Sequence, residues 1–235
     1  MTPLAAFTPT RSCLLRAAHT LLYARMTKGR GRQARQPEVT RRRIVEAAGR
    51  LFAKRGFNGV GFRDIATAAR VSLRMPNHHF GTKEQLFAEC VRYALTEKMD
   101  FPALFASEPS GTATRIAAKI RACFFAVIPP DGRSSWCGEI LGRALTENLN
   151  DALKAFQDGL RPAREWFHPA LRTIRPRMTP TAFALWYGSL WAQVSFFVTA
   201  RAAILARLGK RRYDKALVRM AANHLVHGML KQLEN

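Results

Sequence analysis

The stretch Phe62–Phe80, FRDIATAARVSLRMPNHHF, decides the fold of this 235-residue chain. Ile65, Ala66 and Ala69 recur at the spacing of one helix face. After a short turn the sequence can start a second helix, with Ser72 well placed as its cap. Two short helices joined by an abrupt turn form a helix-turn-helix. Because such a unit cannot bury its own apolar face, the flanking segments must supply its core.

Helices are expected on both sides of this unit. The segment from about 38 to 55 carries apolar residues at i, i+4, i+7 and i+8, and Gly56 is a natural stop after it. Downstream, Thr82 and Gln85 make a capping box for a longer helix, expected from Lys83 to about Met99. Three helices and the start of a fourth then enclose one small core.

The charge of the chain points to a polyanionic partner. Lys and Arg number 38 against 16 acidic residues, which gives a net charge of +22. Nucleic acid is the first candidate partner and an anionic membrane surface the second. Residues 27–80 alone hold 13 basic and three acidic residues, so the excess is dense around the helix-turn-helix. Neutralising phosphates releases counterions, which makes the expected binding steeply dependent on salt.

Nothing in the sequence nominates a catalytic or metal site. The chain has no GxSxG, HExxH, P-loop or GxGxxG motif in a suitable context, so no enzyme activity and no cofactor are predicted. His224 and His227 lie three apart but have no acidic or thiol partner near in sequence, and a structural role is expected. The cysteines are widely spaced and are interpreted as reduced cytosolic thiols: Cys13, Cys90, Cys123 and Cys137.

Residues 1–37 are expected to form a disordered basic arm. Residues 1–25 are rich in Ala, Leu and Arg and lack acids. They fit a transit peptide, or else an over-extended start or tail before a true start at Met26, and the second interpretation is preferred. Residues 27–37, TKGRGRQARQP, have no apolar face. Their basic side chains can follow phosphates or enter a minor groove: Lys28, Arg30, Arg32 and Arg35.

The order of motifs from Thr40 to Tyr93 resembles the DNA-binding domain of the TetR family of bacterial regulators. The resemblance is carried by the apolar first helix, the Gly-Phe corner, Arg-Asp-Ile-Ala, Val-Ser at the turn, His-Phe and Lys-Glu. Residues 77–84, of the form Asn-x-His-Phe-Gly-Thr-Lys-Glu, are similar to the branch with a CerR/CecR-type C-terminal domain.

The resemblance implies an all-α, cytoplasmic, dimeric transcriptional regulator. A helix-turn-helix DNA-binding domain is expected over residues 38–84 and an effector-binding and dimerisation domain over 85–235. Repression is implied by the family, in which the protein occupies a palindromic double-stranded operator and releases it when a small-molecule effector binds.

Candidate DNA contacts surround the turn. Arg41, Arg42, Arg43, Arg63 and Lys83 are expected to contact phosphates. Lys83 is placed at a capped helix N-terminus, where its charge adds to the exposed amides. Base readout is expected from Leu73, Arg74, Asn77 and His78, and Ser72 and His79 complete the candidate set. Arg74 suits guanine, whereas Asn77 suits adenine or a phosphate.

Four residues of the helix-turn-helix depart from the family's habit. Arg70 stands where the family usually has Gly, so a positive φ there would cost strain. Pro76 lies inside the second helix, where it is expected to remove a hydrogen bond. His78 replaces a Tyr that contacts phosphate in the branch, and Gly61 lacks the usual hydroxyl. A short or distorted recognition helix is expected.

Beyond Met99 further helices are expected over 112–128, 134–147 and 150–174, the last one bent at Pro162 and Pro169. The aromatic residues of this region can line a ligand cavity or form an ordinary core. Only the family resemblance favours a cavity, for which the candidate lining residues are Phe124, Trp136, Trp166, Phe167 and Trp186.

Met178–Ala200 contains no charged residue. A membrane span is one interpretation, but six polar residues and a coiled-coil-like spacing favour a buried interface between helices. With residues 214–233 it resembles the two helices through which the family dimerises as a four-helix bundle. The expected interface residues are Phe183, Tyr187, Leu190, Val194, Phe197, Ile204, Ala221, Leu225 and Gly228.

Two other functions remain open from the sequence. A basic nucleic-acid-binding protein without sequence preference would fit the charge and the unusual turn. A membrane-associated helical protein would fit Met178–Ala200, although no membrane partner is expected.

Overall fold

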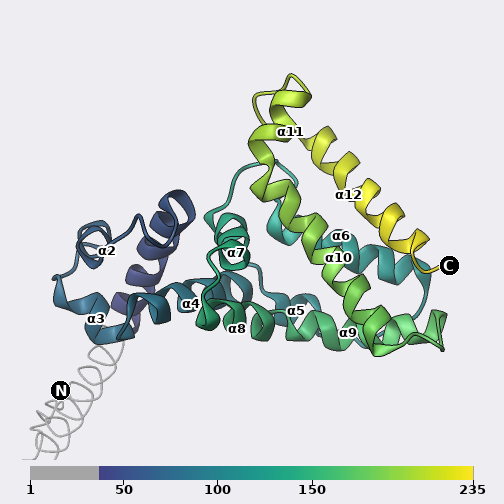
Figure 1. Ribbon diagram of the computed structural model, residues 1–235, viewed down its shortest axis with the longest axis horizontal. Helices are drawn as coiled ribbons and strands as arrows, with labels where there is room; N and C mark the ends of the chain where they lie inside the picture. Colours follow the sequence, from purple (N-terminus) through teal and green to yellow (C-terminus); the bar gives the residue numbers. More distant parts are fainter. Residues whose placement is uncertain (1–36, 235) are drawn as a thin grey trace, which may run out of the picture. The chain divides into compact units, whose positions relative to one another are not determined.

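The computed structural model describes residues 37–234, and every regular element in that range is a helix (Figure 1). The all-α fold is therefore confirmed. The chain divides into residues 1–43 and residues 44–235, and each part is considered by itself. The predictions for residues 1–36, which include the arm side chains Lys28, Arg30, Arg32 and Arg35, lie outside the described residues.

The second part begins with the helix-turn-helix. Residues 37–55 are helical, with the boundary between the two parts inside this first helix. The helices that follow are α2 (Phe62–Ala69), α3 (Arg74–Phe80) and α4 (Lys83–Tyr93). Their shared core contains side chains with no exposed surface, among them Ile44, Phe52, Ile65, Leu86 and Phe87. This is the core that the apolar spacing predicts.

Arg70 ends α2 in a left-handed conformation, with φ at 53° and ψ at 51°. The Val71 N–H donates to the Ala66 carbonyl and the Arg70 N–H to the Thr67 carbonyl, at 3.0 and 3.1 Å. This pair of bonds is a Schellman closure, which normally uses glycine at the left-handed residue. Arg70 therefore has the positive φ at which strain is expected for a residue other than glycine.

Replacing Arg70 by glycine is expected to raise the free energy of unfolding by about 1 kcal/mol, because glycine adopts positive φ without the Cβ clash. Arg70→Ala is the matched control, since it removes the side chain but keeps the Cβ. Urea denaturation of the three proteins measures the difference. Equal midpoints for the alanine and glycine variants would contradict this account.

The start of α3 differs from the prediction. Its N-cap is Leu73, and no side chain caps it, so the expected cap by Ser72 is wrong. The helix begins at Arg74, which makes Pro76 its third residue. The first four N–H groups of a helix have no partner within it, so proline at the third position removes no helical hydrogen bond. Pro76 is buried, and the helix that carries it runs regularly to Phe80.

The long helix expected to reach Met99 changes type after Tyr93. A π-helical turn, η1 (Ala94–Lys98), continues α4. Asp100 then adopts a left-handed conformation, with φ at 50°, and caps the short helix α5 (Phe101–Leu104) by accepting from the Ala103 N–H. The chain thus passes from α4 into the larger helical region through an irregular junction.

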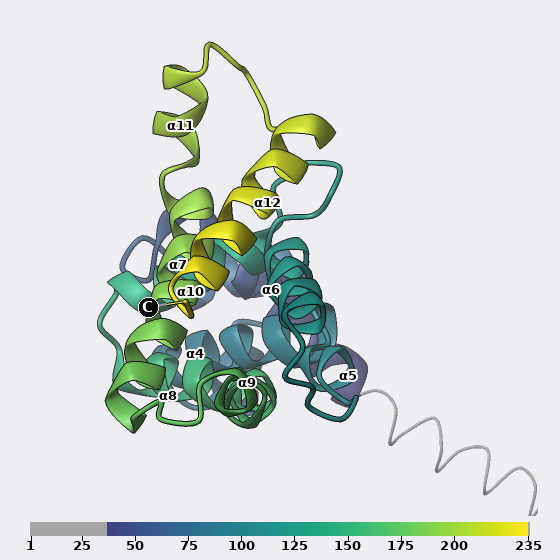
Figure 2. The same cartoon turned by 90° about the vertical axis from the view of Figure 1, so that its right-hand side faces the viewer.

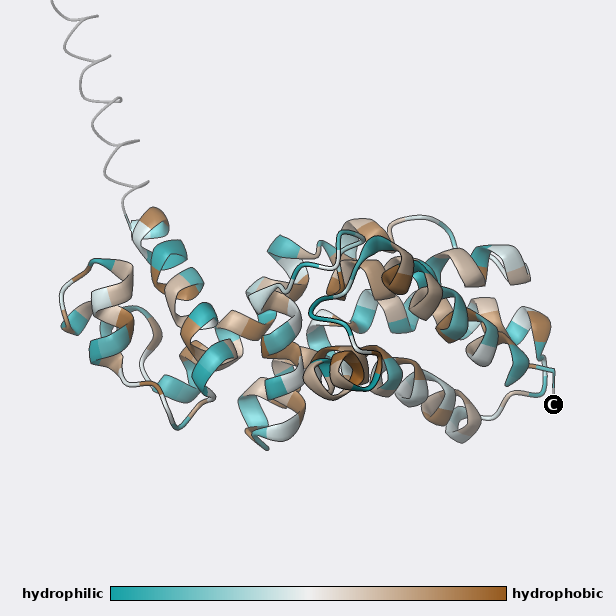
Figure 3. Ribbon diagram, turned by 90° about the horizontal axis from the view of Figure 1, so that it is seen from above, coloured by the Kyte–Doolittle hydropathy of each residue, from teal (hydrophilic) through white to brown (hydrophobic). Residues whose placement is uncertain are grey.

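The remaining helices form the larger region (Figures 1 and 2). They are α6 (Ala113–Val127), α7 (Trp136–Thr146), α8 (Asn150–Gly159), α9 (Arg161–Ile174), α10 (Pro180–Thr199), α11 (Arg201–Arg207) and α12 (Lys215–Lys231). The helix expected over 150–174 is divided at Leu160, two residues before Pro162. Most helices carry both hydrophobic and hydrophilic residues, as helices with one buried face do (Figure 3).

Helices α10 and α12 are joined by a buried hydrogen bond from Trp186 Nε1 to the Met229 carbonyl at 3.0 Å, and α6 packs against both (Figure 2). Among the described helices none is by itself both long enough and apolar enough to cross a bilayer. Helices α10 and α11 meet the length and composition criteria only as a pair, and that pair is bent by 70°.

Candidate nucleic-acid interface

Helix α3 presents its predicted reading residues to solvent. Arg74, Asn77 and His78 are exposed, and Leu73 retains 53% of its surface. Pro76 and Phe80 occupy the opposite face and are buried. On this exposed face Arg74, Asn77 and His78 carry hydrogen-bonding groups that suit base edges and phosphates, and Leu73 can make an apolar contact with a base. We call Leu73, Arg74, Asn77 and His78 the reading face.

The other candidates around the turn differ in exposure. Arg63 on α2 and Ser72 in the turn are exposed, as a phosphate contact requires. His79 is half-buried, with its ring 5.5 Å from His78 and 6.0 Å from Phe80, and so it packs beside the reading face. In the first part of the chain, Arg42 and Arg43 are exposed and Arg41 is half-buried.

Lys83 was predicted to be available for a phosphate at the N-terminus of α4. In the structure its ammonium group is instead bonded within the chain. Its Nζ donates to the carbonyls of Phe57 and Val60 at 3.1 and 3.2 Å, and lies 4.2 Å from the centre of the Phe57 ring. The capping box of α4 is present as predicted, with Thr82 and Gln85 bonded to each other's backbone N–H. The ammonium therefore closes the corner between the first helix and α2, and its role as a phosphate contact is not supported by this geometry.

Replacing Lys83 by methionine is expected to lower the free energy of unfolding by about 2 kcal/mol, because two charge-assisted hydrogen bonds and a cation–π contact are lost. Lys54→Met, at an exposed position of the first helix, is the control. Urea denaturation gives the comparison. A loss of DNA affinity without a loss of stability would instead restore the phosphate role.

Glu46 connects the first helix to the end of α4. Its carboxylate accepts from the Tyr93 hydroxyl at 2.9 Å and pairs with Lys98 Nζ of η1 at 2.8 Å. The hydrogen bond with Glu46 raises the pKa of Lys98. Tyr93 stacks in turn on Trp136 at the start of α7, with ring centres 6.4 Å apart, and a Cβ at Gly49 would overlap the Trp136 ring. This junction was not predicted, because its signal in the sequence is no more than Glu46, one of two acids in a basic helix.

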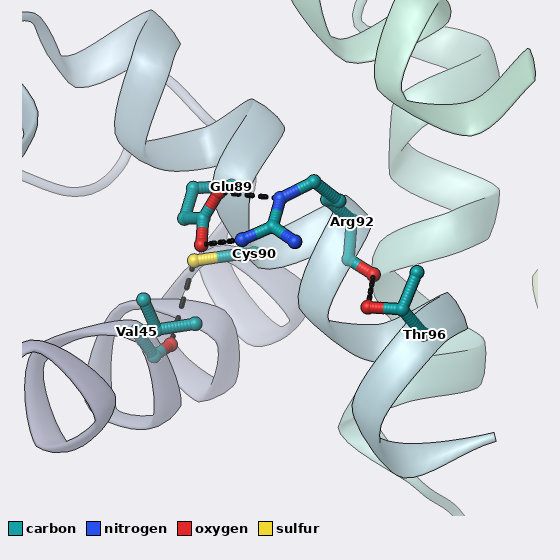
Figure 4. A network of polar contacts seen from close by, with 5 residues as sticks. All are labelled: Val45, Glu89, Cys90, Arg92 and Thr96. Carbon is teal, nitrogen blue, oxygen red and sulfur yellow. Dashed lines mark hydrogen bonds and ion pairs between the residues drawn. The ribbon is translucent and has the colours of Figure 1, made fainter. Parts of the chain in front are cut away.

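One further hydrogen bond joins α4 to the first helix, and other polar contacts lie within α4 and between α4 and η1 (Figure 4). The Cys90 thiol donates to the Val45 carbonyl at 3.4 Å, and burial raises the pKa of this thiol well above its usual value. Arg92 pairs with Glu89 on the exposed side of the same helix, and the Thr96 hydroxyl donates to the Arg92 carbonyl at 3.0 Å. Helix α4 thus carries contacts to the first helix along both its α-helical and its π-helical segments.

The corner after the first helix also contacts α7. Glu147, which follows α7, accepts a hydrogen bond from the Phe57 N–H at 3.1 Å, and Arg143 lies 3.8 Å from the same carboxylate oxygen. A cleft of about 590 Å³ opens nearby, between Ala53 and the helices α7, α10 and α11. Its polar lining includes Glu139, Arg143 and Arg201. The sequence carries no local signal for this cleft.

The five candidate effector-pocket residues do not lie together. Trp166, Phe167 and Trp186 form one chain of ring contacts, with centres 5.3 and 5.4 Å apart. Phe124 packs elsewhere, against Phe197 at 5.3 Å. Trp136 lies at the Tyr93 junction. Among the five, only the first three come from neighbouring positions of α9 and α10, so a single pocket lined by all five is not formed.

The expected dimer interface is largely buried within the chain itself. Leu190 and Leu225 have no exposed surface and Val194 has 1%, while Phe183 and Ala221 retain 7% and 8%. These side chains contact the chain's own core and cannot meet a second copy. Tyr187, Phe197, Ile204 and Gly228 are half-buried. The predicted residues lie on α10, α11 and α12, and most of those on α10 and α12 face the chain's own core.

Comparison with known proteins finds relatives of the helix-turn-helix segment. Residues 44–90 match the model of the bacterial regulatory proteins of the TetR family. The chain is 37% identical over 67 residues to the transcriptional repressor NicS of Pseudomonas putida, covering 28% of this chain and 32% of that protein. It is 34% identical over 100 residues to the regulator BetI of Rhizobium meliloti, covering 42% and 49%. These matches span from about a third to half of the length of the two relatives.

Solved structures share the fold over most of the chain. A transcriptional regulator from Rhodococcus superposes with a TM-score of 0.59 at 20% identity, covering 83% of this chain and 96% of that one. A putative regulator from Pseudomonas aeruginosa gives 0.61 at 17%, covering 85% and 92%. The structure of AibR in complex with isovaleryl coenzyme A and operator DNA gives 0.54 at 18%, covering 80% and 96%. At such identities the likeness shows the fold alone.

Proposed function

We propose that this chain is a ligand-responsive transcriptional regulator of the TetR family, because residues 44–90 match the model of that family's DNA-binding domain. It binds a palindromic DNA operator as a dimer, acts as a repressor, and releases the DNA when a small molecule binds its C-terminal helices. The observation that carries the proposal is the reading face of α3, exposed by a helix whose other side is anchored in a closed core. NicS, to which this chain is 37% identical over 67 residues, is named as a repressor.

The local geometry supports sequence reading by α3. Pro76 lies in the first turn, so Arg74 and Asn77 project from a regular helix. Arg74 can donate two hydrogen bonds to guanine, and Asn77 can pair with adenine or hold a phosphate. His78 can supply the phosphate contact that a Tyr makes in the branch suggested by residues 77–84. That branch, with a CerR/CecR-type C-terminal domain, is part of the proposal, as is a cytoplasmic location.

Dimerisation is proposed through the outer face of α10 and α12. On α10 this face carries Leu185 and Phe196, which retain 68% and 56% of their surface, and on α12 it carries Met220, which retains 66%. Gly188 lies between the first two at helical spacing, and a Cβ there would meet no atom within 4 Å. Exposed apolar side chains around a small residue allow two helices to approach closely. A dimer holds two reading faces about 34 Å apart, one turn of DNA.

Release is proposed to act through η1. The Lys98–Glu46 ion pair and the Tyr93–Glu46 hydrogen bond link the segment leading into α5 to the first helix of the DNA-binding domain. A ligand that moves α5 therefore also moves the helices that position α3, and a coupling of this kind needs the ligand to bind one arrangement better than the other.

A second candidate function is nucleic-acid binding without sequence preference, which the net charge of +22 favours. Such a protein gains its affinity from phosphates and loses it uniformly as salt rises. The two functions differ in whether the reading face contributes to the choice of DNA sequence.

Electrophoretic mobility shift and footprinting on the DNA upstream of the protein's own gene test the proposal, with a shuffled fragment as competitor. Arg74→Ala is expected to weaken binding to the protected site about 10- to 100-fold and to reduce the preference over shuffled DNA. Arg172→Ala, on the exposed side of α9, is the control for loss of one charge. Equal affinity for both fragments would favour the second function, and no shift at low salt would contradict both.

A further inference from the structure

Lys119 of α6 lies half-buried against an aromatic cluster. Its Nζ donates to the Leu104 carbonyl and lies 5.2 Å from the centre of the Phe105 ring and 5.4 Å from that of Trp166. Within residues 37–234 no carboxylate forms an ion pair with it. Burial lowers the pKa of Lys119, as removal of a cation from water does. One N–H of the ammonium thus has a backbone acceptor, and its charge has no counterion in the described part of the chain.

Trp166 of α9 adds a second donor at the same place. The residue is 2% exposed, and its indole Nε1 is buried without a hydrogen-bond partner. Its ring centre lies 6.2 Å from that of Phe105 and 5.3 Å from that of Phe167. A buried N–H that finds no acceptor costs stability, so a native protein seldom keeps one without a use.

The chemistry of these two groups defines what can satisfy them. Both are donors, one of them charged, so the missing partner is an acceptor and preferably an anion. The surroundings are the rings of Phe105, Trp166 and Phe167, which favour an apolar body. Lys154, by contrast, is exposed and pairs with Asp158 at 2.9 Å, so its charge has a counterion.

We propose that Lys119 and Trp166 form the polar end of a binding site for an organic anion with an apolar body, in which the anion accepts from both side chains. The inference rests on the proposed function, because it gives the effector its chemical class.

An anion bound at this site would affect the contacts between α5, η1 and the first helix. The present acceptor of Lys119 is the carbonyl of Leu104, the last residue of α5. An anion competes for that ammonium and so loosens the hold of α6 on α5. Helix α5 follows directly on Asp100, which has a left-handed backbone, and on η1, whose Lys98 pairs with Glu46.

Two fluorescent probes of nearly the same shape test the charge. Anilinonaphthalene sulfonate carries an anion on an aromatic body, and N-phenyl-naphthylamine is the neutral counterpart. Fluorescence titration of the full chain is expected to show the sulfonate binding roughly 10-fold or more tightly than the amine, as a charge-assisted hydrogen bond requires. Lys119→Met is expected to abolish the preference, and Trp166→Phe to weaken sulfonate binding roughly 5-fold.

Lys154→Met is the matched control and is expected to keep the preference. Thermal unfolding of the Lys119→Met protein provides a second readout. It is expected to stay folded at the temperature of the titration although the hydrogen bond to the Leu104 carbonyl is lost, so that a change in probe binding reports on the site and not on unfolding.

Equal binding of the two probes, absence of sulfonate binding, or a preference that survives in Lys119→Met would each overturn the proposal. Operator binding is measured on the same proteins without probe. If it persists while the probe test fails, the effector site is wrong and the regulator function stands. If it also fails, the proposed function fails independently.

Discussion

Replacing both Leu185 and Phe196 by arginine is expected to give a folded monomer whose affinity for the operator is lower by roughly 100-fold or more. Both side chains are exposed on α10, so the single chain loses little by their replacement. In a two-fold symmetric interface each change occurs twice, and like charges then face each other at its centre. Without the partner, one reading face must bind one half-site alone.

Arginine is chosen because it raises the positive charge, so weaker DNA binding cannot be attributed to lost phosphate attraction. Sedimentation velocity gives the oligomeric state, and a mobility shift gives the affinity. Leu145→Arg, at an exposed position of α7 that keeps 41% of its surface, is the control. A double variant that still sediments as a dimer would place the interface elsewhere.

Replacing Phe87 by alanine is expected to lower the free energy of unfolding by about 3–5 kcal/mol. Phe87 has no exposed surface, and its ring centre lies 5.0 Å from that of Phe52 and 5.7 Å from that of Phe57. The cavity would adjoin the ring over which Lys83 lies, so the corner before α2 would lose support from two sides. Such a loss is a large part of the total stability of an ordinary domain.

Urea denaturation measures the loss of stability, and an electrophoretic mobility shift with operator DNA measures the loss of affinity. Both are expected, because the reading face is supported by the same core. Phe87→Leu is the matched control and is expected to cost less than about 1.5 kcal/mol, since it keeps most of the volume. A loss below about 1 kcal/mol in the alanine variant would show that the core around Phe87 collapses without cost.

The sequence predicted the helix-turn-helix because its signals are local. Apolar spacing places the core residues Ile65 and Ala69, and the capping box of Thr82 and Gln85 marks the start of α4. The predicted start of α3 was one residue too early. Ser72 is a residue type that often caps helices, but the N-cap of α3 is the next residue, Leu73. That offset alone made Pro76 look harmful.

Three residues predicted for an interface on α10, Phe183, Leu190 and Val194, are buried within the chain, for a different reason. That helix is apolar on both its inner and outer faces, and a spacing pattern cannot tell which of two apolar faces meets the chain's own core. Leu190 and Leu185 are chemically alike, yet one has no exposed surface and the other 68%. The hydrogen bonds of Lys83 could not be predicted from the sequence either. Its acceptors are backbone carbonyls, which any residues at positions 57 and 60 would supply.

The π-helical turn after Tyr93 has a consequence for comparing this chain with its relatives. A π-turn accommodates one residue more than an α-helix needs to reach the same point on the helix surface. A relative whose fourth helix is α-helical throughout therefore reaches the equivalent of α5 one residue sooner than this chain does at Phe101. Aligning the two without a gap in Ala94–Lys98 would shift the residues that directly follow, Phe101 of α5 among them, by one position.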